Sequence, residues 1–217
     1  ARARRQFPFP DRFETRATVT TDRDAETLPW HSMAWWGLLA GSAAIGMGMA
    51  DYPLIAYHLH AVAGTGPAMV SAAYAGAMAM DAVVALLLGI LFDRWGMWVN
   101  GPAFLITALA GPLVFVGTGA YPWLGLAIWG LGMGAQESTL RATVAGLVPQ
   151  ACRATAYGVF YAVFGGAWLI GSVAMGWLYE RSLTWTAEWS GCWIAVGGVL
   201  LLVSAFAAGQ RGDRVAA

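Results

Sequence analysis

The chain has 217 residues, of which 59% are hydrophobic and only 11% are charged, and its mean hydropathy is +0.59. Ordinary soluble domains carry about 25% charged residues, and a globule of this length could not bury so large an apolar excess. The composition therefore predicts an integral membrane protein. The net charge of zero gives no electrostatic reason to expect a nucleic-acid partner.

Residues 1–29 form a polar arm ahead of the hydrophobic body. The arm contains six arginines, five acidic residues and three prolines and shows no apolar period, which is typical of a flexible linker. It has neither an initiator Met nor the apolar core of a signal peptide. We therefore expect the chain to begin partway through a longer protein.

From Trp30 onward, apolar runs of about 18 to 26 residues alternate with short polar breaks, which is the length a helix needs to cross a bilayer. The sequence predicts an all-α transmembrane domain over residues 30–210, followed by a tail at 211–217. The six predicted spans are 33–57, 67–92, 99–116, 122–148, 155–179 and 191–208.

Arginine placement predicts the orientation of these spans. With six crossings, the arm, the tail and the loop that contains Arg94 fall on one side, whereas Arg181 falls on the other. By the positive-inside rule, both ends of the chain are cytoplasmic.

Small residues recur every fourth position in several spans, so each set lines one helix face. Such faces predict close helix packing. The sets are Gly37 and Gly41, Gly130 and Gly134, and Gly158, Ala162 and Gly166.

The stretch "GILFDRWG", Gly89 to Gly96, resembles the G-x-L-x-D-R-x-G signature of major facilitator superfamily transporters. That signature lies between the second and third helices of each six-helix half. The stretch from Gly134 to Glu180, with its "LVP" and "TAYG" turn, resembles the tenth and eleventh helices of bacterial members. The sequence departs from the signature at Met97 and Trp98, where basic residues usually follow.

This resemblance implies that the chain is the C-terminal six-helix half of a transporter in a bacterial cytoplasmic membrane, with part of the central linker. The expected partners are the lipid bilayer, a small-molecule substrate and an N-terminal half of the same polypeptide. The resemblance also implies a gating loop in which Asp93 latches the outward-facing state, with Arg141 as its candidate partner in this half. The residues of this gating loop are Gly89, Asp93, Arg94, Gly96 and Arg141.

Three acidic residues fall within the predicted spans, where a carboxylate is costly unless it is paired, hydrated or protonated. Asp81 lies 12 residues before Asp93, about 18 Å along a helix, near mid-membrane. Glu137 and Arg141 are four residues apart and could pair. Asp51 lies where Pro53 can break helical hydrogen bonding. These acids either bind substrate or protons, or lock helices together.

The remaining polar candidates are weaker. His58 and His60 are expected at the outer mouth of the first span, as solvated residues or as pH sensors. Cys152 and Cys192 are expected to be unpaired packing residues, and no Cys/His spacing predicts a metal site.

No motif predicts an enzyme or a cofactor, since a G-x-S-x-G elbow, H-E-x-x-H, a Walker loop and a strand-borne G-x-G-x-x-G are all missing from the sequence. Two hypotheses remain. The favoured one is a secondary transporter that moves a small solute by alternating access, with or without proton coupling. The alternative is a six-span membrane scaffold or partner subunit that does not transport.

Overall fold

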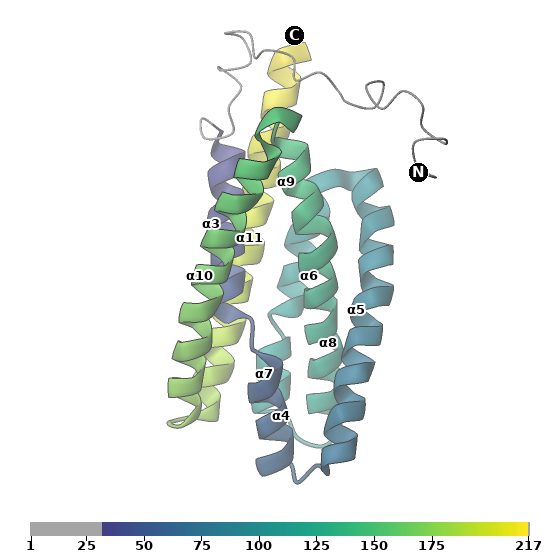
Figure 1. Ribbon diagram of the computed structural model, residues 1–217, viewed down its shortest axis with the longest axis vertical. Coiled ribbons are helices and arrows are strands. Elements are labelled where there is room, and N and C mark those ends of the chain that lie inside the picture. The colour runs from purple at the N-terminus through teal and green to yellow at the C-terminus, as the bar shows by residue number, and fades with distance from the viewer. Residues whose placement is uncertain (1–31, 217) are drawn as a thin grey trace, which may run out of the picture.

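The computed structural model describes residues 32–216, with side chains for residues 32–209, so the predicted polar arm lies outside the described residues. The described part is helical and contains no strand (Figure 1). Its α-helices are α3 (Met33–Gly48), α4 (Tyr52–Ala61), α5 (Pro67–Trp95), α6 (Asn100–Thr107), α7 (Ala110–Phe115), α8 (Tyr121–Ala135), α9 (Arg141–Leu147), α10 (Arg153–Tyr179) and α11 (Leu183–Ala216). Short 3-10 turns occupy Gly96–Val99 and Gln150–Cys152, and a π-helical turn, Gln136–Leu140, joins α8 to α9.

Four helical stretches of the described chain are long and apolar enough to cross a membrane. They are Met33–Ala61, Pro67–Phe115, Gln150–Tyr179 and Leu183–Gly209. In the second stretch the chain turns back at Gly96, whose φ of 60° favours glycine, so that α5 and α6 run in opposite directions (Figure 1). The prediction of an all-helical chain with helices able to span a membrane is confirmed for the described residues.

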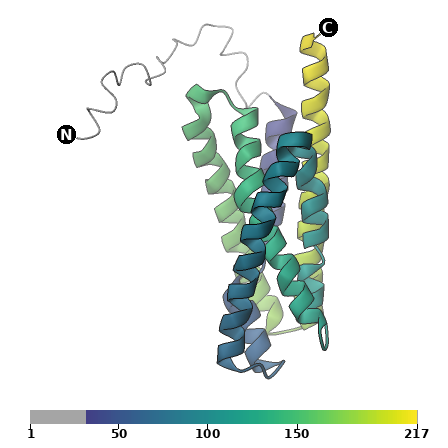
Figure 2. The same ribbon diagram turned by 90° about the vertical axis from the view of Figure 1, so that its right-hand side faces the viewer.

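Helix ends collect at two levels of the bundle. The start of α3, the end of α5, the end of α9 and the start of α10 lie at the upper end in Figure 1, whereas the turns after α4, α7 and α10 lie at the lower end. Helix α3 packs on α10 and α11, and α8 packs on α5 and α7. Helix α5 lies at one edge of the bundle in Figure 1, and Figure 2 shows it crossing in front of the other helices.

Glycines bring two of these helix pairs into close contact. Gly41 of α3 lies against Leu201 and Gly197 of α11, and Gly134 of α8 lies against the backbone of Asp81 in α5. The predicted packing faces of α3 and α8 are thus confirmed.

The close packing predicted for the third set of small residues, Gly158, Ala162 and Gly166 on α10, does not occur within the described chain. No atom lies within 4 Å of where a side chain at Gly158 or Gly166 would begin. Helix α10 instead packs on α3 through a face that includes Phe164 and Gly171, since Gly171 lies against the backbone of Met47.

Both ends of the last helix differ clearly from prediction. Helix α11 begins at Leu183 rather than at Gly191, because Ser182 initiates it: the Ser182 hydroxyl accepts the Trp185 N–H at 3.3 Å. At its other end α11 continues to Ala216, into the predicted tail. The first predicted span is interrupted, and this interruption positions the candidate site.

Candidate functional site

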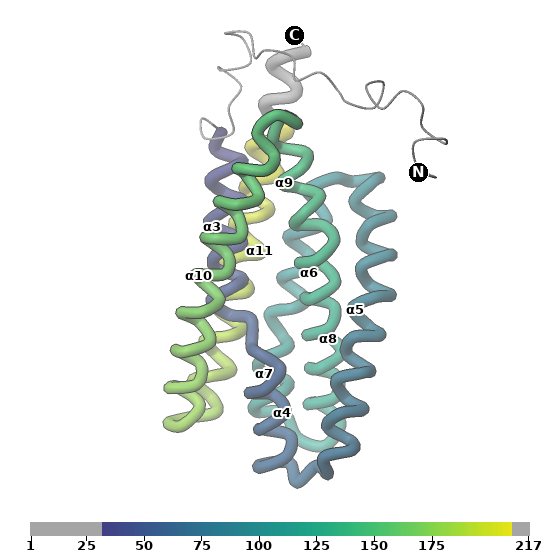
Figure 3. The backbone as a smooth tube through the Cα atoms, in the orientation of Figure 1, coloured from purple at the N-terminus to yellow at the C-terminus, as the bar shows by residue number. Residues whose placement is uncertain are grey.

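Helices α3 and α4 are two halves of one interrupted rod, as the smooth trace in Figure 3 shows. The last regular bond of α3 runs from the Met49 N–H to the Ile45 carbonyl, and α4 restarts with the Leu54 N–H bonded to the Asp51 carbonyl. Pro53 suits the restart because it lies in the first turn of α4, where its missing N–H needs no intrahelical partner, and Asp51 just before this turn is extended. The predicted break near Pro53 is confirmed.

The interruption frees backbone carbonyls that the rest of the bundle then satisfies. The Trp189 indole N–H donates to the Met47 carbonyl at 2.8 Å, and the Ser190 hydroxyl donates to the Gly48 carbonyl at 2.7 Å. The Trp129 indole N–H of α8 donates to the Ala50 carbonyl at 2.8 Å. Because a buried carbonyl without a partner costs about 1–3 kcal/mol, these donors are what makes the break tolerable.

Asp51 lies at the break, and its carboxylate bonds to α10. The Trp168 indole N–H donates to Asp51 Oδ1 at 2.6 Å, and the Ser172 hydroxyl donates to Asp51 Oδ2. Neither donor carries a charge, and no described residue forms an ion pair with Asp51. The carboxylate is therefore held in place but is not neutralised by its neighbours.

A cavity of about 410 Å³ opens beside this carboxylate, between α4 and α10. Its wall is apolar apart from Asp51, the Tyr57 phenol and the Ser172 hydroxyl. The residues that line it are Asp51, Pro53, Leu54, Tyr57, Ser172, Met175 and Gly176. This is a concave apolar site with a few polar groups, the ordinary design of a small-molecule site.

A second polar region joins α5 to the π-helical turn. Asp81 is the central residue of α5, and its Oδ1 is buried without a hydrogen-bond partner among the described residues. Glu137 lies on the π-helical turn that packs against α5. The Gln136 side-chain oxygen is also buried without a partner in the described structure. π-Helical turns recur at functional sites, and this one brings a second acid to Asp81.

The predicted pairing of Glu137 with Arg141 does not form, and both side chains are exposed. An exposed ion pair contributes only about 0–1 kcal/mol, which is too little to hold two flexible side chains together. Arg141 instead contributes its backbone carbonyl, which accepts the Tyr157 hydroxyl at 2.9 Å.

The predicted gating loop lies at the upper end of the bundle, where α5 ends. Asp93 and Arg94 are both exposed, and the Arg94 guanidinium lies 6.0 Å from the Trp95 ring. In the described part of the chain no ion pair joins Asp93 to Arg141. Gly96 makes the turn, as its positive φ requires, and Gly89 has open space where a side chain would be. The loop thus forms no ion pair within the described part of the chain.

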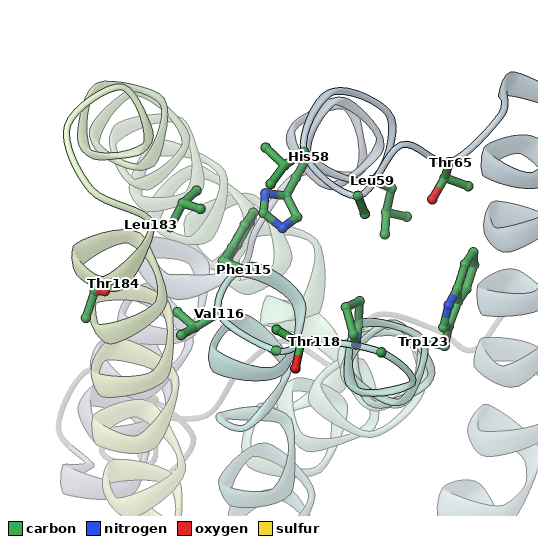
Figure 4. Close-up of a pocket in the computed structure, with 14 residues that line it drawn as sticks. His58, Leu59, Thr65, Phe115, Val116, Thr118, Trp123, Leu183 and Thr184 are labelled. Carbon is green, nitrogen blue, oxygen red and sulfur yellow. The ribbon is translucent and has the colours of Figure 1, made fainter.

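A larger cavity, of about 720 Å³, lies at the opposite end of the bundle. Figure 4 shows Leu59 and Thr65 on one side of it and Thr118 and Trp123 on the other. The expectation that His58 is solvated is wrong: the residue is only 4% exposed, and its Nδ1 lies 3.0 Å from the Tyr179 hydroxyl. His60 is exposed, with its Nδ1 2.8 Å from the Thr65 carbonyl.

Sequence reasoning named Asp51 as a candidate but missed the side chains that hold the break. These residues are Trp129, Trp168, Ser172, Trp189 and Ser190. The spacing of these residues carries no sign of which carbonyl or carboxylate an indole or a hydroxyl will reach. A helix break beside Pro53 does predict that donors are needed, although it does not say where they come from.

Comparisons with known proteins found relatives of this chain, but these relatives are uncharacterised. The chain is 36% identical over 180 residues to the uncharacterised proteins Mb2288 of Mycobacterium bovis and Rv2265 of Mycobacterium tuberculosis. The match covers 82% of this chain but 44% of each relative, so the chain spans less than half the length of these proteins. No family model matches the chain, and no solved structure was found to match it.

Proposed function

We propose that the chain is the C-terminal half of a secondary transporter of the major facilitator type, which moves a small solute by alternating access. The observation that carries this proposal is the interrupted rod α3–α4, with Asp51 and a cavity at the break. Discontinuous helices with polar groups at the break are the usual form of a transporter binding site.

The arrangement of helices supports six crossings. The helices alternate in direction in Figure 1, so the end of α5 and the α9–α10 turn lie at the same end of the bundle. That end would be cytoplasmic by the positive-inside rule. The length of the mycobacterial relatives leaves room for a second half of similar size. The exposed apolar side chains of α5 and α10, among them Leu86, Ile90 and Ile170, would then face lipid or that other half.

Alternating access is testable by thiol labelling of the full-length protein. With Cys152 and Cys192 replaced by alanine, we expect a single cysteine at Gly176, beside the Asp51 cavity, to react with a membrane-impermeant maleimide from either side of the membrane. Blocking one face first should leave a fraction that reacts later from the other face.

Two control variants show which side of the membrane the reagent has reached. Cys152, retained alone in the α9–α10 turn, should react only from the cytoplasm, and a Thr118→Cys variant in the opposite loop only from outside. If the cysteine at Gly176 reacts from one side under every condition, the chain does not alternate and the scaffold alternative is favoured.

Proton coupling is the finer part of the proposal, and the Asp81–Glu137 pair is its candidate site. Asp81 Oδ1 is buried without a hydrogen-bond partner in the described structure, and the turn that carries Glu137 packs against α5, so a proton bound at Asp81 would remove a costly buried charge. We expect Asp81→Asn and Glu137→Gln to remove the dependence of solute uptake on a proton gradient, measured in proteoliposomes with and without an imposed pH difference. Unchanged gradient dependence in both variants would exclude these residues as proton carriers.

A further inference from the structure

We infer that the cavity beside Asp51 binds a small organic cation, with the Asp51 carboxylate as its charged anchor. This inference rests on the proposed transport function and specifies the class of solute. Three properties of the site carry it: an acid without a countercharge, a mainly apolar wall, and the size of the cavity.

The first property is the charge of Asp51. Its two hydrogen-bond donors, the Trp168 indole and the Ser172 hydroxyl, fix the direction of the carboxylate but bring no positive charge. The cavity lining contains no arginine, lysine or histidine. Asp51 is half-buried, and a partly buried carboxylate is stabilised by a nearby cation, so the site supplies one charge and leaves the other to its ligand.

The second property is the chemistry of the wall. Pro53, Leu54 and Met175 are apolar, and the Tyr57 side chain adds an aromatic ring, which attracts cations through its π-electrons. A bare metal ion of the calcium type requires about six to eight oxygen ligands, whereas Asp51, Ser172 and Tyr57 offer few. The wall therefore suits an ammonium group that carries alkyl substituents.

The third property is size and surroundings. A volume of about 410 Å³ falls within the range of small-molecule sites, roughly 300–1,000 Å³. The only charged side chain in the lining is that of Asp51, so the cavity favours cations over anions of equal size.

The test uses the purified full-length protein, with melting temperature as the readout. The probes are tetraethylammonium, choline and the neutral isostere of choline, 3,3-dimethylbutan-1-ol, each at millimolar concentration. Because a ligand that binds only the folded state raises its stability, we expect at least one cation to raise the melting temperature by about 3 °C or more. The neutral isostere should have no effect.

Two variants test whether the change in melting temperature arises from binding beside Asp51. Asp51→Asn should abolish the shift, whereas Glu188→Gln, which alters an exposed acid on α11, should keep it. Should Asp51→Asn fail to fold, Tyr57→Leu leaves the carboxylate and its two donors in place and should weaken cation binding severalfold.

The inference is overturned if neither cation stabilises the protein, if the neutral isostere stabilises it equally, or if Asp51→Asn responds like the wild type. A melting temperature that follows pH but ignores both cations would make Asp51 a proton site instead. Thiol labelling at Gly176 on the same preparation separates the two proposals. If Gly176→Cys is labelled from both sides but no cation binds, the transport proposal holds and the cation proposal is refuted. If labelling occurs from one side only, both proposals are refuted.

Discussion

Replacing Asp93 by asparagine in the full-length protein is expected to lower the rate of solute uptake by at least about tenfold, while insertion and yield stay at wild-type levels. Asp93 is exposed at the end of α5 and forms no ion pair within the described chain, so its removal costs this half little stability. A hydrogen bond to a charged group contributes about 1.5–3 kcal/mol, and 1.4 kcal/mol is already a factor of ten in rate.

The measurement is the initial rate of uptake into proteoliposomes, with size-exclusion chromatography of the detergent-solubilised protein as a check of folding. Glu188→Gln is the matched control, since it removes a charge from an exposed acid at the opposite end of the bundle. Uptake at the wild-type rate in Asp93→Asn would refute the gating role of the "DRWG" loop.

Gly171→Ala is expected to lower the melting temperature by about 3–10 °C. A methyl group at this position would lie 2.6 Å from the Met47 Cα and 2.7 Å from the Met47 carbonyl carbon. These are backbone atoms that cannot rotate away, so α10 must shift from α3 and strain the bonds that Asp51 makes with α10. Overpacking of this kind costs roughly 1–3 kcal/mol.

Gly165→Ala on the same helix serves as the comparison. No atom lies within 4 Å of the added methyl group there, and alanine favours a helix over glycine by about 0.5–1 kcal/mol. Thermal unfolding of both variants in the same detergent should therefore separate them clearly. Equal melting temperatures would show that the α3–α10 contact yields without cost.

The sequence predicted the features that depend on local chemistry. Apolar runs predicted the helices, Pro53 predicted the interruption of the first one, and the glycines at 41 and 134 predicted close contacts. Each of these follows from a property of the residue itself or of its near neighbours.

Features that depend on distant segments could not be predicted. The indole of Trp189 reaches a carbonyl of α3 that is 142 residues away in the chain, and no period or motif encodes that meeting. The π-helical turn around Glu137 also went unseen, because a run of ordinary helix formers gives no sign of an extra residue in a turn. The roles of Asp51, Asp81 and Glu137 remain predictions.

The break between α3 and α4 also bears on how the protein is made. The carbonyls of Met47 and Gly48 receive their donors from Trp189 and Ser190, which are synthesised 142 residues later. At 5–20 residues per second this delay is on the order of ten seconds. During that time the two carbonyls must stay hydrogen-bonded to water, or the segment must form a continuous helix in which they bond to backbone N–H groups. The dry form of this break, in which both carbonyls bond to protein donors, is therefore completed only when α11 has packed against α3.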